Sequence, residues 1–405
     1  MRLFHSIRLL ALLALPAGAQ VTYDPAALAS ARTRVKAGDA ALKPAYDRLL
    51  ADAAKALAAK PAVVTDKHTL LPPSGDRHDY FSLSPYWWPD PSKPDGLPYI
   101  RRDGETNPES KRDLDQPRVA QMGGNSMTLA LAYYFTRDEK YAAGAARQLR
   151  AWFLDSATRM TPHLRYAQAV RGNPEERGSG IIDTRWFMEA TDAARLLEGS
   201  KSWTPGDMAA LRDWMKQYEQ WLWTSKNGQH EHAAKNNHGS WYAAQVSALA
   251  LFAGDTAVAR QLVGEAKPRI GWQITPAGEQ PTELERTRSF HYSGFNVEAL
   301  SRLSMVARAL GTDLWHYTAP EGGSIKAGLD RLAQYAPNPK AWPGQQIDDV
   351  DQDLLLVSFR RADAMLGEPA YLPTIRALPA SLTTTDRSAL VWPDPVTNAV
   401  RKDGR

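Results

Sequence analysis

The chain has 405 residues, of which 43% are hydrophobic and 9% aromatic, and it contains no cysteine. This composition predicts a globular protein with a large core, and it excludes disulfide bonds, a thiol nucleophile and any cysteine-ligated metal centre. The 49 basic and 45 acidic residues give a formal charge of +4, a near-neutral balance that offers no broad basic face for nucleic acid.

Residues 1–19 have the pattern of a secretory signal peptide. Two arginines precede an apolar run over residues 9–15, and small residues follow it, which predicts cleavage before Gln20. Loss of Arg2 and Arg8 leaves 47 basic residues against 45 acidic ones, a net charge of +2. No later stretch is apolar over the length needed to cross a bilayer. We therefore expect a secreted, periplasmic protein with no membrane contact after cleavage.

Two regions of different character follow the signal peptide. Residues 25–60 place apolar side chains at helical spacing, which predicts one or two amphipathic helices. Residues 61–117 contain ten prolines and clustered aromatic residues, which predicts a long structured loop of the kind that often serves function.

Beyond residue 118 the sequence is helical almost to its end. The Thr204-Pro205 pair is a helix start signal, and four glycines are placed to close or follow helices: Gly199, Gly228, Gly254 and Gly311. The predicted helices lie near 118–136, 139–155, 182–198, 205–224, 236–253, 255–270, 292–310, 325–335 and 350–364.

These elements favour an all-α fold. Neither sustained strand-like alternation nor a short internal repeat is found in the sequence, which argues against all-β, doubly wound and consensus-repeat architectures. Antiparallel helix pairs with long connections are typical of an incomplete (α/α) toroid, here with a long aromatic and Pro-rich loop near its N-terminus. No Gly/Ser-rich linker marks a boundary, so we expect one domain over residues 20–405.

The first candidate cluster is Asn236-Asn237-His238, at the start of a helix that continues through Leu249. Asparagine is a favoured helix N-cap, so either amide is explained by helix initiation alone. Two amides and an imidazole at the positive end of a helix also suit the binding of a carboxylate.

The second candidate cluster places four groups within seven residues: Arg286, Arg288, His291 and Tyr292. A purely structural alternative pairs the two arginines with the adjacent Glu283 and Glu285 and treats Tyr292 as a core residue. Both explanations stay open for this segment when it is considered alone.

Together the two clusters suit one reaction, β-elimination from a 4-linked uronic acid. The C5 proton is barely acidic because its removal adds negative charge beside a carboxylate, so amide and cationic donors must neutralise that group. A base must take the C5 proton, and an acid must protonate the departing O4. In mannuronate and glucuronate both lie on one ring face, so a single tyrosine near an arginine can perform both transfers.

The clusters also resemble the motifs of the alginate lyase family of α/α-toroid polysaccharide lyases. The similarity covers Asn236-Asn237-His238, the segment from Glu283 to Tyr292, and two stretches at 84–91 and 97–104. It extends over about residues 80–310. The resemblance implies that Asn237 and His238 bind and neutralise the carboxylate, that Arg286 assists, and that Tyr292 is the acid and base, with no metal or other cofactor.

One departure from the family pattern bears on which polymer the protein cleaves. Arg286 and Tyr292 are six residues apart, one fewer than in the best-known alginate-specific branch, and the His-Asn-Tyr run of that branch is missing. Alginate is therefore the first expected substrate and glucuronan the second. If Tyr292 were dispensable, His238 would become the preferred base and guluronate the more suitable sugar.

Further residues are predicted to contact the acidic polysaccharide or oligosaccharide substrate. They are Tyr86, Trp87, Trp88 and Tyr99 in the Pro-rich loop, Arg165 and Gln168 beside a Gly-rich segment, and Asn236, Trp241, Arg288 and His291 near the two clusters. Packing within the loop explains Arg165 and Gln168 at least as well. Other tryptophans at helical spacing are expected in the core.

Two segments resemble metal-binding motifs but lack the ligands that such sites require. His230-Glu231-His232 lacks a convincing third ligand, and we expect these residues to be solvent-exposed. The aspartates of residues 348–353 lack the glycine and terminal glutamate of a calcium loop, so a solvated helix start is the better explanation.

Two other classes of protein remain as alternatives to a lyase. A glycoside hydrolase on the same scaffold would need two facing carboxylates, for which Glu283, Glu285 and Asp183 are the candidates. A non-catalytic glycan-binding protein would need only the aromatic loop. The combined clusters favour a secreted polysaccharide lyase that cleaves a uronate polymer by metal-independent β-elimination.

Overall fold

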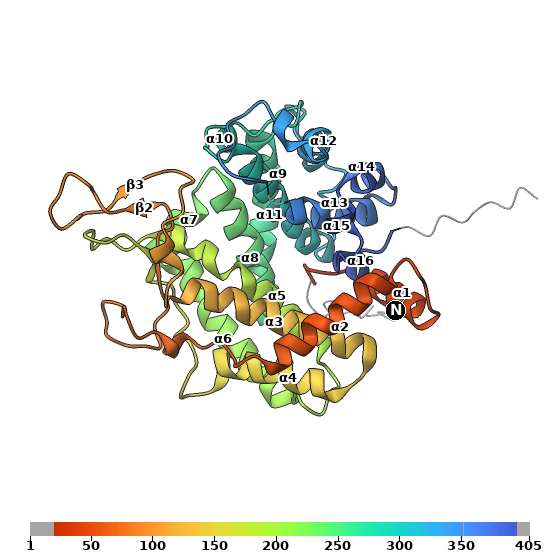
Figure 1. The fold of residues 1–405 in the computed structure, drawn as a ribbon, viewed down its shortest axis with the longest axis horizontal. Helices are drawn as coiled ribbons and strands as arrows, with labels where there is room; N and C mark the ends of the chain where they lie inside the picture. The colour runs from red at the N-terminus through yellow and green to blue at the C-terminus, as the bar shows by residue number, and fades with distance from the viewer. Residues whose placement is uncertain (1–19, 351, 395–405) are drawn as a thin grey trace, which may run out of the picture.

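The computed structural model describes residues 20–350 and 352–394. The predicted signal peptide, residues 1–19, lies outside the described residues. Helices dominate, as the sequence predicts (Figure 1). They are α1 (Pro25–Lys36), α2 (Lys43–Ala58), α3 (Asp115–Thr136), α4 (Glu139–Leu149), α5 (Phe187–Leu196), α6 (Pro205–Thr224), α7 (Lys226–His232), α8 (Asn237–Ala253), α9 (Thr256–Gln273), α10 (Pro281–Leu284), α11 (Ser289–Ala309), α12 (Ile325–Tyr335), α13 (Gln352–Leu366), α14 (Leu372–Ala377), α15 (Ala380–Thr383) and α16 (Ser388–Val391).

Short 3-10 segments and strands connect the helices. The 3-10 segments are η1 (Val64–Asp66), η2 (Pro108–Lys111), η4 (Gly178–Trp186) and η5 (Pro339–Ala341), and η3 (Arg150–Leu154) is a π turn. The strands are β1 (Phe81–Leu83), β2 (Trp87–Trp88), β3 (Ile100–Arg101) and β4 (Tyr166–Ala169). β1 pairs in parallel with β4, and β2 pairs antiparallel with β3 so that Trp87 lies opposite Arg101.

Several helix ends follow the predicted signals. Thr204 and Asp207 form a reciprocal capping box at the start of α6, which satisfies backbone N–H groups that have no partner within the helix. Gly254 ends α8 with a φ of 95°, a left-handed conformation that glycine adopts without steric cost.

Gly228 follows α6 as predicted, but it does not close a helix, because it lies inside the unpredicted helix α7. A Cβ atom at this position would lie 1.7 Å from the carbonyl oxygen of Leu222. The glycine therefore allows α7 to pack closely against the end of α6. Two predicted helices are also shorter than expected: the one near 139–155 ends as a π turn, and the one near 182–198 begins as the 3-10 segment η4.

The core is centred on α8, which packs against α5, α6, α9 and α11. Most residues of α8 are buried, from Asn237 to Phe252, as expected for a helix that is apolar on all sides. Near the chain ends, α16 packs against α1, α2 and α13. The last described helix thus meets the first two.

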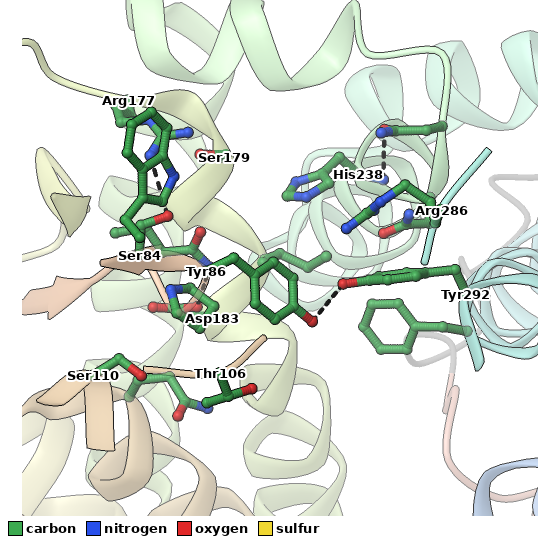
Figure 2. A pocket seen from close by; sticks show the side chains of 18 of the residues that line it. Ser84, Tyr86, Thr106, Ser110, Arg177, Ser179, Asp183, His238, Arg286 and Tyr292 are labelled. Atoms are coloured by element: carbon green, nitrogen blue, oxygen red, sulfur yellow. Dashed lines mark hydrogen bonds between the residues drawn. The ribbon is translucent and has the colours of Figure 1, made fainter. Parts of the chain in front are cut away.

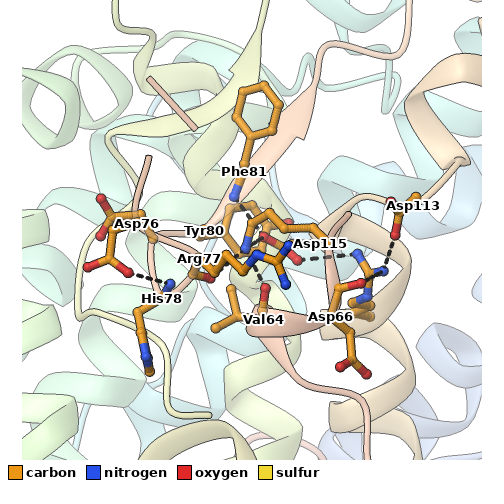
Figure 3. Close-up of polar contacts among 12 residues, drawn as sticks. Val64, Asp66, Asp76, Arg77, His78, Tyr80, Phe81, Asp113 and Asp115 are labelled. Atoms are coloured by element: carbon orange, nitrogen blue, oxygen red, sulfur yellow. Dashed lines mark hydrogen bonds and ion pairs between the residues drawn. The ribbon is translucent and has the colours of Figure 1, made fainter. Parts of the chain in front are cut away.

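The Pro-rich segment is fastened to the helical body by a buried ion pair. Lys67 Nζ lies 2.8 Å from Asp115 Oδ2, and both side chains are fully buried (Figure 3). Lys67 also donates to the carbonyl oxygens of Val64 and Arg77, and Asp115 accepts the backbone N–H of Phe81. Burial raises the pKa of Asp115 to about 6 although Lys67 opposes the shift. These bonds connect η1 and β1 to the start of α3.

The β2–β3 hairpin lies at the left edge of the molecule in Figure 1, beside α7.

Among the described residues, no helix has both the length and the apolarity required to cross a membrane.

Candidate active site

A cavity of about 580 Å³ lies between the Pro-rich segment and the helical body, a size suited to ligands of several rings. Its walls come from the β1–β2 connection, η2, η4, α7, the start of α8, the α10–α11 connection and the start of α11. It brings both sequence clusters together, with ten of the predicted site residues: Tyr86, Trp87, Gln168, Asn236, Asn237, His238, Arg286, Arg288, His291 and Tyr292.

Tyr292, in the first turn of α11, is 7% exposed. Its hydroxyl lies 2.6 Å from the hydroxyl of Tyr86, and the guanidinium carbon of Arg286 lies 3.7 Å from its ring centroid (Figure 2). Burial, with the neighbouring Tyr86, raises the pKa of Tyr292 well above the ordinary tyrosine value, and the Arg286 charge opposes this shift. The resting side chain is therefore a neutral phenol.

Arg286 is held by the connection that follows β3. Its Nε and Nη2 donate to Asp103 at 3.1 and 2.7 Å, and the backbone N–H of Thr287 donates to the same carboxylate. Burial alone would raise the pKa of Asp103, but the hydrogen bonds from Arg286 and Thr287 outweigh it and hold this pKa well below its usual range. The bidentate pair fixes the guanidinium beside the Tyr292 ring.

The structure does not contain the ion pairs of the purely structural alternative for the second cluster. Arg286 pairs with Asp103, and Arg288 Nε lies 3.3 Å from Asp348. Glu283 is fully buried and binds Asn237 instead, while Glu285 is exposed. Both arginines pair with carboxylates that are distant in the sequence and that the fold brings close, rather than with the adjacent glutamates.

Asn236 and Asn237 have different roles at the start of α8. The Asn236 side chain caps the helix by accepting the N–H of His238 at 3.2 Å, as the structural explanation predicts. The backbone N–H and the side-chain amide of Asn237 donate to the two oxygens of Glu283 at 2.6 and 2.7 Å. Burial raises the pKa of Glu283, although the hydrogen bonds from Asn237 oppose the shift.

His238 is oriented by a carboxylate that the sequence analysis placed in solvent. Its Nδ1 lies 2.5 Å from Glu231 Oε1, and Glu231 is only 2% exposed. The expectation of exposure is therefore wrong for Glu231, because α7 packs against the start of α8. Burial lowers the pKa of His238, but the charges of Glu231 and Glu283 outweigh this and raise it overall. The neighbouring His232 pairs with Glu265 at 2.5 Å.

Four predicted contact residues are not among the described residues that line the cavity. Trp241 is 2% exposed and packs against Phe295. The other three are held by bonds of their own: Trp88 Nε1 donates to Glu105 O, the Tyr99 hydroxyl to Glu109, and Arg165 lies 3.4 Å from Glu176.

Gln168 lines the cavity, but its side-chain amide donates to Asp183 at 2.9 Å. The same carboxylate accepts the hydroxyls of Tyr80 and Ser82. Gln168 and Asp183 therefore help to hold β1 and β4 beside the cavity.

Several residues of the site are not predicted from the sequence. Asp103 and Glu231 position Arg286 and His238, and three basic side chains also line the cavity: Lys111, Arg177 and Arg185. Arg177 and Arg185 flank a Gly-rich segment that gave no signal beyond packing.

The carboxylates of the cavity are engaged with other groups. Asp183 and Glu231 line it, but Asp183 accepts three hydrogen bonds and Glu231 binds His238. In the described part of the chain, no group of three or more His, Asp or Glu side chains is placed to hold a metal ion.

Comparisons with known proteins point to one family. The family model described as alginate lyase matches residues 63–342. The crystal structure of an alginate lyase from Bacteroides ovatus is 39% identical, with a TM-score of 0.86, over 93% of this chain and 99% of that chain. No match was found among curated proteins.

Two more distant structures share the fold. Alginate lyase A1-III from Sphingomonas species A1 is 17% identical, with a TM-score of 0.60, over 94% of this chain and 98% of that chain. A variant of that enzyme complexed with tetrasaccharide is 17% identical, with a TM-score of 0.61, over 95% and 98%.

The helical fold and these matches define the protein as a polysaccharide lyase. The family model covers well over half of the chain, and the Bacteroides ovatus enzyme is similar over nearly its whole length. The chain belongs to the alginate lyase family.

Proposed function

We propose that this polysaccharide lyase cleaves alginate, an acidic polysaccharide, by metal-independent β-elimination in the cavity described above. The observation that carries the proposal is the convergence of Asn237, His238, Arg286 and Tyr292 on one cavity. The similar alginate lyases, one of them complexed with tetrasaccharide, support this substrate. The six-residue spacing between Arg286 and Tyr292 keeps glucuronan as a second polymer to test.

Neutralisation of the substrate carboxylate is the first requirement of the reaction. The Glu231 and Glu283 charges raise the pKa of His238 and so favour the positively charged imidazole. Asn237 has a second hydrogen on its amide nitrogen that does not bind Glu283, and Arg286 adds a fixed positive charge. Donors aimed at the carboxylate lower the energy of the enolate that forms when C5 loses its proton.

Tyr292 is the proposed acid and base. The resting phenol first loses its proton to solvent water. The phenolate then takes the C5 proton, the C5–H electron pair forms the C4–C5 double bond, and the C4–O4 bond breaks. The new phenol then gives this proton to O4, which restores the phenolate. The Arg286 guanidinium against the Tyr292 ring is the group that stabilises the phenolate.

Three expectations on the whole chain complete the proposal. Residues 1–19 direct export and are removed, residues 20–405 form one domain, and the helix pairs form an incomplete toroid. The contacts of α16 with α1 and α2 support a ring-like order of helices.

The test is incubation of the purified protein with mannuronate-rich alginate, guluronate-rich alginate and glucuronan. A lyase releases an unsaturated uronate, which absorbs in the ultraviolet, whereas a hydrolase releases reducing ends without that absorbance. Absorbance growth on at least one alginate is the expected result. Reducing ends without absorbance, or neither signal on any polymer, would overturn the proposal.

A further inference from the structure

The basic residues that line the cavity differ in how their charges are balanced. Arg101 and Arg286 share Asp103 at 2.6 and 2.7 Å, and Arg288 pairs with Asp348. Three other cavity cations have no carboxylate at ion-pair distance among the described residues: Lys111, Arg177 and Arg185. A charge that is partly removed from water without an anionic partner is unfavourable, and an anionic ligand can supply that partner.

Of these three residues, Arg177, at the N-terminal end of η4, has the surroundings best suited to bind an anionic ligand. It is half-buried, its guanidinium carbon lies 5.2 Å from the Trp87 ring, and one N–H donates to Ser84 Oγ at 3.1 Å. The other guanidinium N–H groups have no partner among the described residues. The buried hydroxyl of Ser179, two residues later, also lines the cavity and has no hydrogen-bond partner in the described part of the chain.

The position of Arg177 separates it from the proposed reaction centre. In Figure 2, Tyr86 lies between Arg177 and Tyr292. Burial and the Arg101 charge lower the pKa of Arg177, while the smaller effect of the Glu231 charge opposes the shift. Its charge is therefore poorly compensated in a wall of the cavity that the catalytic cluster does not occupy.

We propose that Arg177, with Trp87 and Ser179, forms a second carboxylate-binding subsite, which takes the uronate next to the one that is cleaved. The inference rests on the proposed function, because it assumes a polymer with a carboxylate on every sugar. Trp87 lies close to the Arg177 guanidinium and lines the cavity, where its ring can contact the sugar, while Ser179 supplies an unused hydroxyl. Arg177 has free N–H groups that match a carboxylate.

The other two cations without carboxylate partners are less suited to this role. Lys111 is exposed and donates to Gln116 at 2.6 Å. Arg185 packs against the rings of Trp241 and Phe295, donates to Ile182 O, and is balanced in part by the nearby charge of Asp183.

The experiment compares Arg177→Ala with Arg112→Ala on mannuronate oligomers at low salt. Arg112 is an exposed arginine that follows the cavity residue Lys111 in sequence but does not itself line the cavity, so its removal matches the loss of charge alone. We expect Arg177→Ala to raise KM about tenfold, the effect of one lost charge-assisted bond, with kcat little changed. Arg112→Ala should change KM less than about twofold.

A binding measurement isolates the subsite from the chemistry. Calorimetric titration of mannuronate oligomers into Tyr292→Phe and into Tyr292→Phe/Arg177→Ala should show about tenfold weaker binding by the double variant. The same oligomers with carboxylates reduced to alcohols should bind both variants equally. Arg177→Gln, which keeps much of the side-chain volume, replaces the alanine variant if thermal melting shows that the latter is unfolded.

The outcomes distinguish the two proposals. Equal KM values for Arg177→Ala and Arg112→Ala, or equal loss of binding with the reduced oligomers, would overturn the subsite while leaving the lyase reaction intact. If the wild-type protein gives no absorbance on any polymer but still binds uronate oligomers through Arg177, the proposed reaction fails and the subsite stands. Binding that is absent in the wild-type protein contradicts both.

Discussion

The surroundings of the Tyr292 phenol favour its protonated form in the resting protein, and Arg286 is the neighbouring group that favours its anion. Burial and the Tyr86 hydroxyl raise its pKa, while the Arg286 guanidinium opposes them. A neutral phenol already carries the proton that O4 needs. It must lose this proton before it can act as the base for C5. Placing Arg286 against the ring reduces the free energy needed for that loss.

Replacement of Tyr292 by phenylalanine removes the proton-transfer group and little else. We expect kcat to fall about 10³-fold, within the range for loss of a general acid or base, while oligomer binding is largely kept. Initial rates from ultraviolet absorbance and calorimetric binding measure the two effects. Tyr46→Phe, on α2, is the matched control, and a near-normal rate for Tyr292→Phe would shift the base to His238.

The pairing of His238 with Glu231 predicts a particular pH dependence. Because the folded pKa of His238 is raised, the imidazolium and its hold on a carboxylate persist below that pKa and are lost as the pH rises through it. Glu231→Gln removes the charge that raises the pKa, while Glu283 and Arg286 still face the ring. We expect the alkaline limb of the kcat/KM profile to move to lower pH.

The control for this shift is Glu265→Gln, which removes the carboxylate paired with His232, a residue outside the cavity lining. Its pH profile should match that of the wild-type protein. An unchanged alkaline limb in Glu231→Gln would show that His238 does not act through its charge.

At the scale of elements, Asp103 joins the connection after β3 to the connection between α10 and α11. Its side chain accepts from Arg286 and Thr287, and its backbone oxygen accepts the Thr287 hydroxyl at 2.7 Å. The hairpin that carries Trp87 is thereby fixed against the segment that carries Tyr292. One residue connects two walls of the cavity.

Asp103→Ala should loosen both walls. We expect a loss of about 1–2 kcal/mol in the free energy of unfolding, because the pair is partly exposed and screened, and a fall of about tenfold in kcat/KM as Arg286 loses its fixed position. Urea unfolding and initial rates measure these effects. Asp90→Ala, in a turn of the same hairpin region, removes a carboxylate that accepts hydrogen bonds from Ser92 and has none with Arg286. Equal behaviour of the two variants would contradict this role for Asp103.

Local sequence pattern predicts elements well where the periodic apolar face is long. The long helices α6, α8 and α11 lie within a few residues of the predicted bounds, since helix periodicity and caps are properties of neighbouring residues. Helix α7 was missed because its seven residues include Gly228, whose packing against Leu222 depends on the end of α6. A glycine that serves close packing cannot be told from a helix stop by its neighbours alone.

The same limit applies to the site. The motif residues from Asn237 to Tyr292 were found because they cluster along the chain, and the structure places them around one cavity. Their partners were not found, because Asp103 lies 183 positions from Arg286. Arg177 carries no local signal either, since only its place in a cavity wall distinguishes it from a surface arginine.

At the scale of the whole molecule, a buried network of charges holds three helices together. Glu298 on α11 binds Arg361 on α13 at 2.7 Å and Arg302 at 2.8 Å, and Arg302 reaches Glu189 on α5. Burial raises the pKa of Glu298, but the two arginines outweigh it and lower this pKa to about 2. The contribution to stability is therefore present at neutral pH and is lost as the pH falls toward about 2.

Arg361→Met breaks this network by removing one partner. We expect the free energy of unfolding at neutral pH to fall by about 3 kcal/mol, because the Glu298 charge loses its bidentate partner while staying buried. Chemical denaturation measures the change. Lys43→Met, which breaks an exposed pair with Asp47, should cost at most about 0.5 kcal/mol. A similar small loss in Arg361→Met would mean that Arg302 alone compensates Glu298.

The contact of α16 with α1 and α2 makes the chain suitable for circular permutation. Arg34, at the end of α1, donates to the backbone oxygen of Asp394, so the last described residue lies beside the first helix. Residues 367–370, between α13 and α14, are all exposed. A circular permutant that joins residue 394 to residue 20 through a flexible linker and opens at residues 367–370 would keep every helix intact.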